Sequence, residues 1–92
     1  MNKHSVYLLQ SEKDGNFYIG QTNDIEKRFL KHNKGEVFAT KYRRPFILLG
    51  YIETQSRTEA MMLEKKLKSH SDQKRKFIRR FVPNFEWKNM RG

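Results

Sequence analysis

The chain has 92 residues, which is enough for one small domain with one hydrophobic core and too few for two. Its 20 Lys and Arg residues outnumber its 10 Asp and Glu residues, and the resulting net charge of +10 favours a polyanionic partner such as a nucleic acid. The absence of cysteine excludes disulfides, thiolate metal sites and cysteine nucleophiles, so any chemistry must use oxygen and nitrogen groups.

The N-terminal residues contain no predicted targeting segment. No apolar run approaches the roughly 20 residues of a membrane-spanning helix. Residues 1–4 lead directly into a strand-like segment without the apolar region of a signal peptide. We therefore expect a cytoplasmic protein that does not associate with a membrane, and the sequence indicates no particular oligomeric state.

The first predicted elements form a β-hairpin. Residues 4–10 carry apolar side chains on both sides of a strand, and residues 17–21 resume a β-rich pattern. Residues 13–16, between them, include Asp, Gly and Asn, which tolerate a turn. Tyr7 and Tyr18 are therefore expected on neighbouring strands.

A helix, a loop and a strand are predicted next. Asn23 and Glu26 have the spacing of a capping box, and the apolar stripe that follows them stops near Gly35. Residues 36–45 show no periodic pattern and are rich in basic residues, which predicts a loop. Residues 46–54 are the most hydrophobic run of the chain, and we predict that they form the central strand.

Two further helices complete the predicted fold. Ser56 and Glu59 form a second capping box, which opens a helix through about Ser69. Asp72 is the expected cap of a third helix, which Pro83 ends. The order β-β-α-β-α-α predicts an α+β fold with a small three-stranded antiparallel sheet flanked by helices. The domain is expected to span residues 1–83, with residues 84–92 as a C-terminal tail.

Glu64 is an unusual residue in the second of these helices. It lies on or beside the stripe formed by Ala60, Leu63 and Leu67, where an unpaired carboxylate would cost several kcal/mol. It should therefore bind a metal, pair with a cation or lie at the mouth of a cleft. Spacing alone favours the simpler alternative, in which Glu64 reaches solvent or pairs with Lys68 at i+4.

Arg28 and His32 are also four residues apart and share one face of the first helix. Such a face suits a phosphate. An exposed arginine and a half-buried histidine are equally ordinary on a surface helix.

Taken together, Tyr7, the tripeptide 18–20 (Tyr-Ile-Gly), the Arg28 and His32 pair, and Glu64 resemble the GIY-YIG nuclease family in order and spacing. The first family tripeptide corresponds to residues 5–7, where Ser-Val replaces the usual Gly-Ile. The resemblance covers residues 4–81. Further matches to small bacterial members are the segments 21–24, 27–29, 32–35, 44–45 and 59–64. Some members carry a second histidine where this chain has Tyr42.

The resemblance implies a divalent-metal-dependent endonuclease that hydrolyses DNA phosphodiester bonds. The implied catalytic residues are Tyr7, Tyr18, Arg28, His32 and Glu64. Glu64 would hold the ion, Tyr7 would take a proton from the attacking water and pass it to His32, and Arg28 would neutralise charge in the transition state. Tyr18 would hydrogen-bond the water or the phosphate.

A single magnesium or manganese ion is expected, because only Glu64 among the ten acidic residues is well placed, whereas two-metal sites need several carboxylates. Basic side chains are expected to contact the DNA backbone without sequence specificity. The predicted contacts are Lys41, Arg43, Arg44, Lys65, Lys68, Lys74, Arg75 and Lys76. The substrate would be branched or structured DNA, or a protein partner would supply the specificity.

Two other functions are compatible with the sequence. One is a non-catalytic nucleic-acid-binding module that retains the nuclease fold. The other is an RNA-associated protein whose rings stack on single-stranded bases, for which Phe17, Phe38 and Tyr42 are the candidates.

Overall fold

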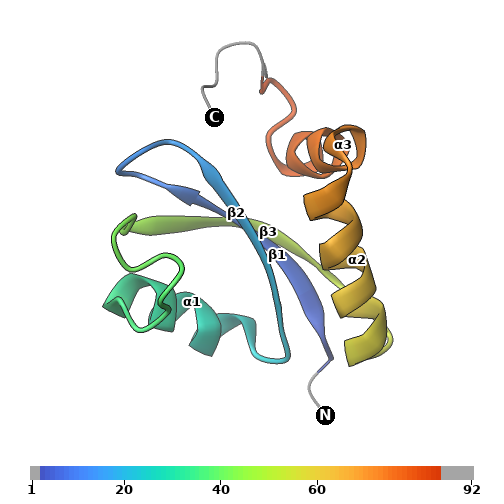
Figure 1. The fold of residues 1–92 in the computed structure, drawn as a ribbon, viewed down its shortest axis with the longest axis horizontal. Coiled ribbons are helices and arrows are strands. Elements are labelled where there is room, and N and C mark those ends of the chain that lie inside the picture. The colour runs from blue at the N-terminus through green and yellow to red at the C-terminus, as the bar shows by residue number, and fades with distance from the viewer. Residues whose placement is uncertain (1–2, 86–92) are drawn as a thin grey trace.

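The alternating apolar residues of the first hairpin and the capped helices that follow it build a three-layered α+β domain (Figure 1). A computed structural model describes residues 3–85. The elements follow the predicted order β-β-α-β-α-α. They are β1 Ser5–Ser11, β2 Phe17–Thr22, α1 Ile25–Lys34, β3 Phe46–Glu53, α2 Arg57–Ser69 and α3 Ser71–Phe81. Helix α1 covers one face of the sheet, and α2 and α3 cover the other.

The central strand is β1, and the prediction that residues 46–54 would be central is wrong. Both neighbours pair antiparallel with β1 in the order β2-β1-β3. Residues 5–9 are buried without a break, as a strand covered on both faces requires. The edge strand β3 exposes Ile47 and Tyr51 to solvent. Part of this hydrophobic run therefore faces solvent and does not pack in the core.

Two apolar clusters lie on opposite faces of the sheet, because successive side chains of a strand alternate. Val6 and Leu8 point toward α2 and α3, where they meet Ile78. Tyr7 and Leu9 point toward α1, and the ring of Phe29 packs against them. The tyrosine of β1 is therefore enclosed between the sheet and α1.

The cap of α1 differs from the predicted one by one residue. Asp24, not Asn23, is the N-cap, and its side chain accepts a hydrogen bond from the backbone of Lys27 at 3.1 Å. Thr22 fixes Asp24, because its hydroxyl accepts from the Asp24 N–H at 3.1 Å. Glu26 is then the second helical residue, which is not the capping-box position. The helix ends as predicted at Gly35, whose φ of 79° is left-handed.

Of the caps predicted for the two C-terminal helices, one is confirmed and one is wrong. The Ser56 hydroxyl accepts from the Glu59 N–H at 3.1 Å and caps α2, as predicted. Helix α3 begins at Ser71, and Asp72 lies within its first turn. The predicted Asp72 cap is therefore wrong, since α3 starts immediately after α2 with His70 as the shared boundary residue.

The segment after α3 continues to pack against the sheet. The ring of Phe85 meets that of Phe17 edge to face, with centroids 5.0 Å apart. Residues 86–92 of the predicted tail lie outside the described residues. Between residues 3 and 85, no helix is long and apolar enough to cross a membrane.

Candidate active site

The pairing of β1 with β2 brings two tyrosines to the α1 face of the sheet. Tyr7 lies opposite Gly20, and Leu9 lies opposite Tyr18, so the two tyrosine rings are neighbours with centroids 6.4 Å apart. The phenol of Tyr7 crosses directly over Gly20, where a β-carbon would overlap it. Glycine at this position therefore lets the Tyr7 hydroxyl pass across strand β2.

The hydroxyl of Tyr7 meets a buried histidine from α1. His32 is fully buried, and its Nε2 lies 2.8 Å from the Tyr7 oxygen. On its other side, Nδ1 lies 2.7 Å from the Thr40 hydroxyl. That hydroxyl lies 3.5 Å from the carbonyl of Val37, toward which it can donate, and on this basis we assign His32 Nδ1–H as the donor to Thr40. His32 Nε2 is then the acceptor of the proton that Tyr7 donates.

Burial keeps both partners of this hydrogen bond uncharged. It lowers the pKa of His32 to about 4, with a smaller contribution from the positive charge of Arg28. It raises the pKa of Tyr7 to about 12, against a hydrogen bond from Arg28 that lowers it. At neutral pH the site therefore holds a neutral phenol that donates to a neutral imidazole.

Arg28 acts on both members of this pair and is itself half-buried. Within residues 3–85, its buried Nε has no hydrogen-bond partner. The side chain lines a cavity of about 370 Å³ together with His4, Gln21, Thr22, Asn23 and Arg57. A second cavity of about 220 Å³ reaches Arg28 from the side of Lys27 and Lys31. The guanidinium therefore borders two open, basic spaces, as an anion-binding group should.

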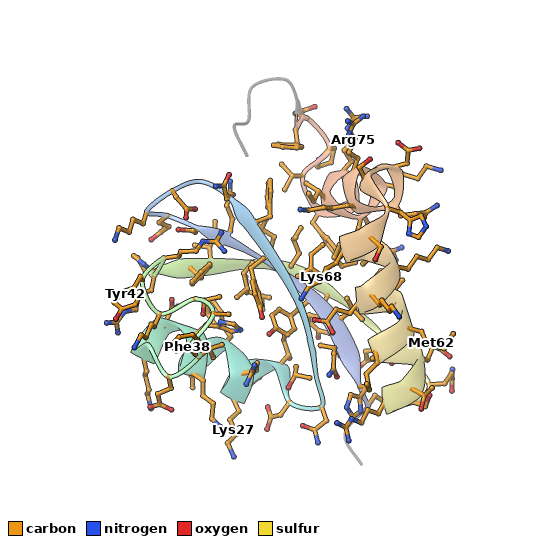
Figure 2. The ribbon with its side chains drawn as sticks, viewed as in Figure 1. Lys27, Phe38, Tyr42, Met62, Lys68 and Arg75 are labelled. Carbon is orange, nitrogen blue, oxygen red and sulfur yellow. The ribbon has the colours of Figure 1, made fainter. Side chains whose placement is uncertain are left out.

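Helix α2 brings Glu64 to the same region from the opposite face of the sheet. The carboxylate forms an ion pair with Lys68 at 2.9 Å, and its side chain is 22% exposed. The Lys68 ammonium also lies 5.3 Å from the centre of the Tyr18 ring, and Figure 2 shows it reaching from α2 toward β2. The charge of Glu64 acts on Tyr7 as well, because it contributes to raising the Tyr7 pKa.

The predicted catalytic residues thus occupy one region, and the predicted DNA contacts are distributed more widely. Lys68 lies in the site. Arg75 of α3 lies far from the loop before β3, which carries three of the predicted contacts and is marked by Tyr42 in Figure 2. Arg43 pairs with Asp14 at 2.8 Å, and Arg44 lies against Gly35, so both have structural contacts. The exposed members are Arg44, Lys65, Lys68, Arg75 and Lys76. Their contacts with DNA stay predictions.

Sequence reasoning missed two residues that complete the site. Thr40 fixes the orientation of His32, but it lies in a loop without a periodic pattern, and its spacing gives no signal. Arg57 joins Arg28 in the wall of the larger cavity. Its position directly after the Ser56 cap places it in the first turn of α2, yet only the packing of α2 beside β2 reveals that it lines the same cavity as Arg28.

Comparison with known proteins agrees with this fold and shows the family. The family model described as the GIY-YIG catalytic domain matches residues 3–77, and the chain therefore belongs to the GIY-YIG family, a nuclease-type family. Among small single-domain relatives, it is similar to a UPF0213 protein of Staphylococcus saprophyticus, with 41% identity over 76 residues that cover 82% of this chain and 92% of the relative.

Two more relatives are of the same kind. A UPF0213 protein of Staphylococcus haemolyticus is 38% identical, with the same shares of the two chains covered. The solution NMR structure of a UPF0213 protein of Bacillus halodurans superposes with a TM-score of 0.51 at 37% identity, covering 85% of this chain and 82% of that one.

Proposed function

We propose that this chain is an endonuclease that hydrolyses DNA phosphodiester bonds with one divalent metal ion, and that its substrate is branched or structured DNA. The supporting observation is the hydrogen-bonded series from Tyr7 through His32 to Thr40, which lies beside Arg28 and its open basic cavities. A proton acceptor, a fixed cation and an open space that can admit a phosphate suit phosphodiester hydrolysis.

The donor groups at the site suit magnesium or manganese. Across residues 3–85 there is no group of three or more His, Asp or Glu side chains that could enclose an ion. Magnesium often takes only one or two carboxylates and keeps several waters, so Glu64 alone fits it. The Lys68 that pairs with Glu64 has a half-exposed side chain, and such pairs are weak enough to exchange. When bound at Glu64, the ion would supply positive charge beside the scissile phosphate.

Tyr7 acts as a proton relay in this proposal. Its pKa of about 12 excludes a standing phenolate at neutral pH, so it takes a proton from the attacking water as it passes its own to His32. His32 is neutral above a pH of about 4 and can accept that proton at Nε2. A bound phosphate strengthens this acceptor, because a nearby negative charge raises the pKa of a histidine.

Arg28 and Tyr18 position and stabilise the reacting phosphate. The guanidinium of Arg28 stays charged at any working pH and offers donors toward a phosphate in either adjoining cavity. Tyr18 lies beside the ring of His32, with centroids 5.2 Å apart, from where its hydroxyl would bind the water or the phosphate.

One observation favours a second candidate, a non-catalytic DNA-binding module. The ion pair between Glu64 and Lys68 is the structural role that helical spacing alone predicts for this carboxylate. In that case Glu64 would need no metal.

The deciding experiment incubates labelled duplex, flap, four-way junction and single-stranded DNA with the protein, with and without Mg²⁺ or Mn²⁺. We expect metal-dependent cleavage, strongest on a branched form. Arg28→Gln should lower the cleavage rate by about 10²–10³ with little change in binding. The matched control is Arg79→Gln, which removes an exposed arginine of α3. Binding without cleavage of any of these DNAs would assign the binding module.

A further inference from the structure

The loop between α1 and β3, residues 36–45, presents two aromatic rings to solvent. The exposed fraction is 85% for Phe38 and 75% for Tyr42, the highest among the large hydrophobic residues described as exposed. Exposed aromatics that are close together usually mark a binding surface. The sequence offered Phe17, Phe38 and Tyr42 as rings that could stack on bases. Phe17 is not available for this, because its ring packs against Phe85.

The exposure of these rings is built into the loop. Val37 and Thr40, which alternate with them, are buried, and Thr40 is held by His32 at 2.7 Å. At the far end, the backbone carbonyl of Arg43 accepts a hydrogen bond from the Ser11 hydroxyl. The buried residues hold the loop, so Phe38 and Tyr42 are directed outward.

A lysine lies between the two rings. The ammonium of Lys41 is 5.4 Å from the centre of the Phe38 ring and 4.9 Å from that of Tyr42. Both distances are within the range of cation–π attraction. We call these three residues the loop aromatic surface, and Figure 2 shows Phe38 and Tyr42 near the end of the molecule that carries α1.

We propose that the loop aromatic surface binds unpaired nucleobases of DNA by stacking, while Lys41 contacts an adjacent phosphate. This inference rests on the proposed function, because it takes DNA to be the substrate. Rings of this kind stack on any base, and a cation among them attracts the backbone, which is the usual composition of a single-strand-binding surface. A protein-binding surface would instead be depleted in lysine at its centre.

The position of the loop aromatic surface would affect which DNA the protein prefers. Thr40, which holds His32, lies two residues from Phe38 and two residues from Tyr42, so the loop that presents the rings is also the loop that orients the histidine of the site. The surface would therefore hold the unpaired arm of a branched DNA while the adjoining backbone reaches Arg28. Plain duplex has no unpaired base to offer.

The test measures binding without divalent metal, so that cleavage plays no part. Fluorescence anisotropy would compare labelled oligo-dT with a duplex of equal length. Phe38→Ala and Tyr42→Ala should each weaken single-strand binding about 10-fold, with less than a roughly 2-fold change on duplex. Phe38→Tyr and Tyr42→Phe keep a ring and should retain the affinity. The control is Met62→Ala, an exposed hydrophobic residue of α2 on another side of the molecule.

Equal losses on both DNAs, or no loss on either, would overturn the inference. Sedimentation of the same variants would test whether the surface instead binds a second copy of this protein. A change in oligomeric state with unchanged affinity for oligo-dT would assign the surface to such protein contacts. The proposed function and this inference can be refuted independently of each other. A protein that cuts no DNA but prefers single strands through these rings would refute only the nuclease, and one that cuts DNA with the rings removed and no such preference would refute only this inference.

Discussion

His32 illustrates at the scale of one residue how burial sets both chemistry and stability. Its ring is enclosed by Tyr7, Tyr18 and Phe46 and bonded at both nitrogens, so the fold accommodates the neutral imidazole and penalises the charged one. The same property keeps Nε2 unprotonated, so that it can accept the hydrogen bond of Tyr7, and it makes the fold sensitive to acid.

We predict that His32 makes stability fall as the pH is lowered below about 6.5. The folded pKa of about 4 lies below the ordinary 6.5, so the unfolded chain binds a proton first and is favoured by acid. Between pH 7.5 and 5, this histidine alone should cost about 2 kcal/mol of unfolding free energy. Urea unfolding at both pH values measures it.

The control for this prediction is a pair of histidine variants. His32→Gln can keep both hydrogen bonds but does not titrate, so the loss between the two pH values should shrink. His70→Gln removes an exposed histidine and should leave the loss unchanged. If His32→Gln and the wild type lose stability in parallel, the histidine is not held neutral by the fold.

At the scale of elements, two glycines of the sheet leave room for aromatic rings that pack on its two faces. On β2, Gly20 makes room for the phenol of Tyr7 from β1. On β3, Gly50 makes room for the ring of Phe81 from α3. A methyl group at either position would displace an aromatic ring, and overpacking of this kind typically costs about 1–3 kcal/mol.

We therefore predict that Gly20→Ala and Gly50→Ala destabilise the fold alike and differ in activity. Gly20→Ala shifts the Tyr7 hydroxyl and should lower the cleavage rate of the folded protein by at least about 10-fold, because displacing a reacting group is costly. Gly50→Ala displaces Phe81 of α3, a helix that supplies none of the proposed catalytic residues, and should leave that rate unchanged. Denaturant melts combined with cleavage under native conditions separate the two effects, and equal rate losses would contradict the assigned role of Gly20.

The sequence predicted the elements well where local patterns decide them. Helices and the hairpin followed from periodicity, turn residues and the Ser56 cap. One error lies where two residues compete locally. Asn23 and Asp24 can both cap a helix, and the hydroxyl of Thr22 selects Asp24. Hydrophobicity likewise could not identify the central strand, because an edge strand such as β3 can expose apolar side chains.

For the whole molecule, composition predicted a basic protein but not the arrangement of its charges. The net charge of +10 is distributed over the loop before β3, α1, α2 and α3, and only folding shows that Arg28 and Arg57 share one cavity. The order of the tyrosines, the arginine, the histidine and the glutamate indicated the family. The hydrogen bond of Thr40 with His32 and the place of Arg57 in the cavity of Arg28 depend on tertiary packing and could not be predicted.

In the proposed nuclease, Glu64 serves catalysis and contributes little to the fold. Its partner Lys68 has a half-exposed side chain, and a pair of this kind contributes only about 0.2–1 kcal/mol. Glu64→Gln keeps the shape of the side chain and removes its charge. Glu59→Gln, on the same helix, is the matched control.

The most direct measurement is cleavage of the preferred DNA by Glu64→Gln with Mg²⁺ present, alongside thermal melts of the metal-free protein. We expect DNA binding like that of the wild type, a melt that changes little, and cleavage lowered by at least about 10². Undiminished cleavage by Glu64→Gln, or a loss of cleavage that only follows a loss of folded protein, would contradict the assignment of Glu64 as the metal ligand.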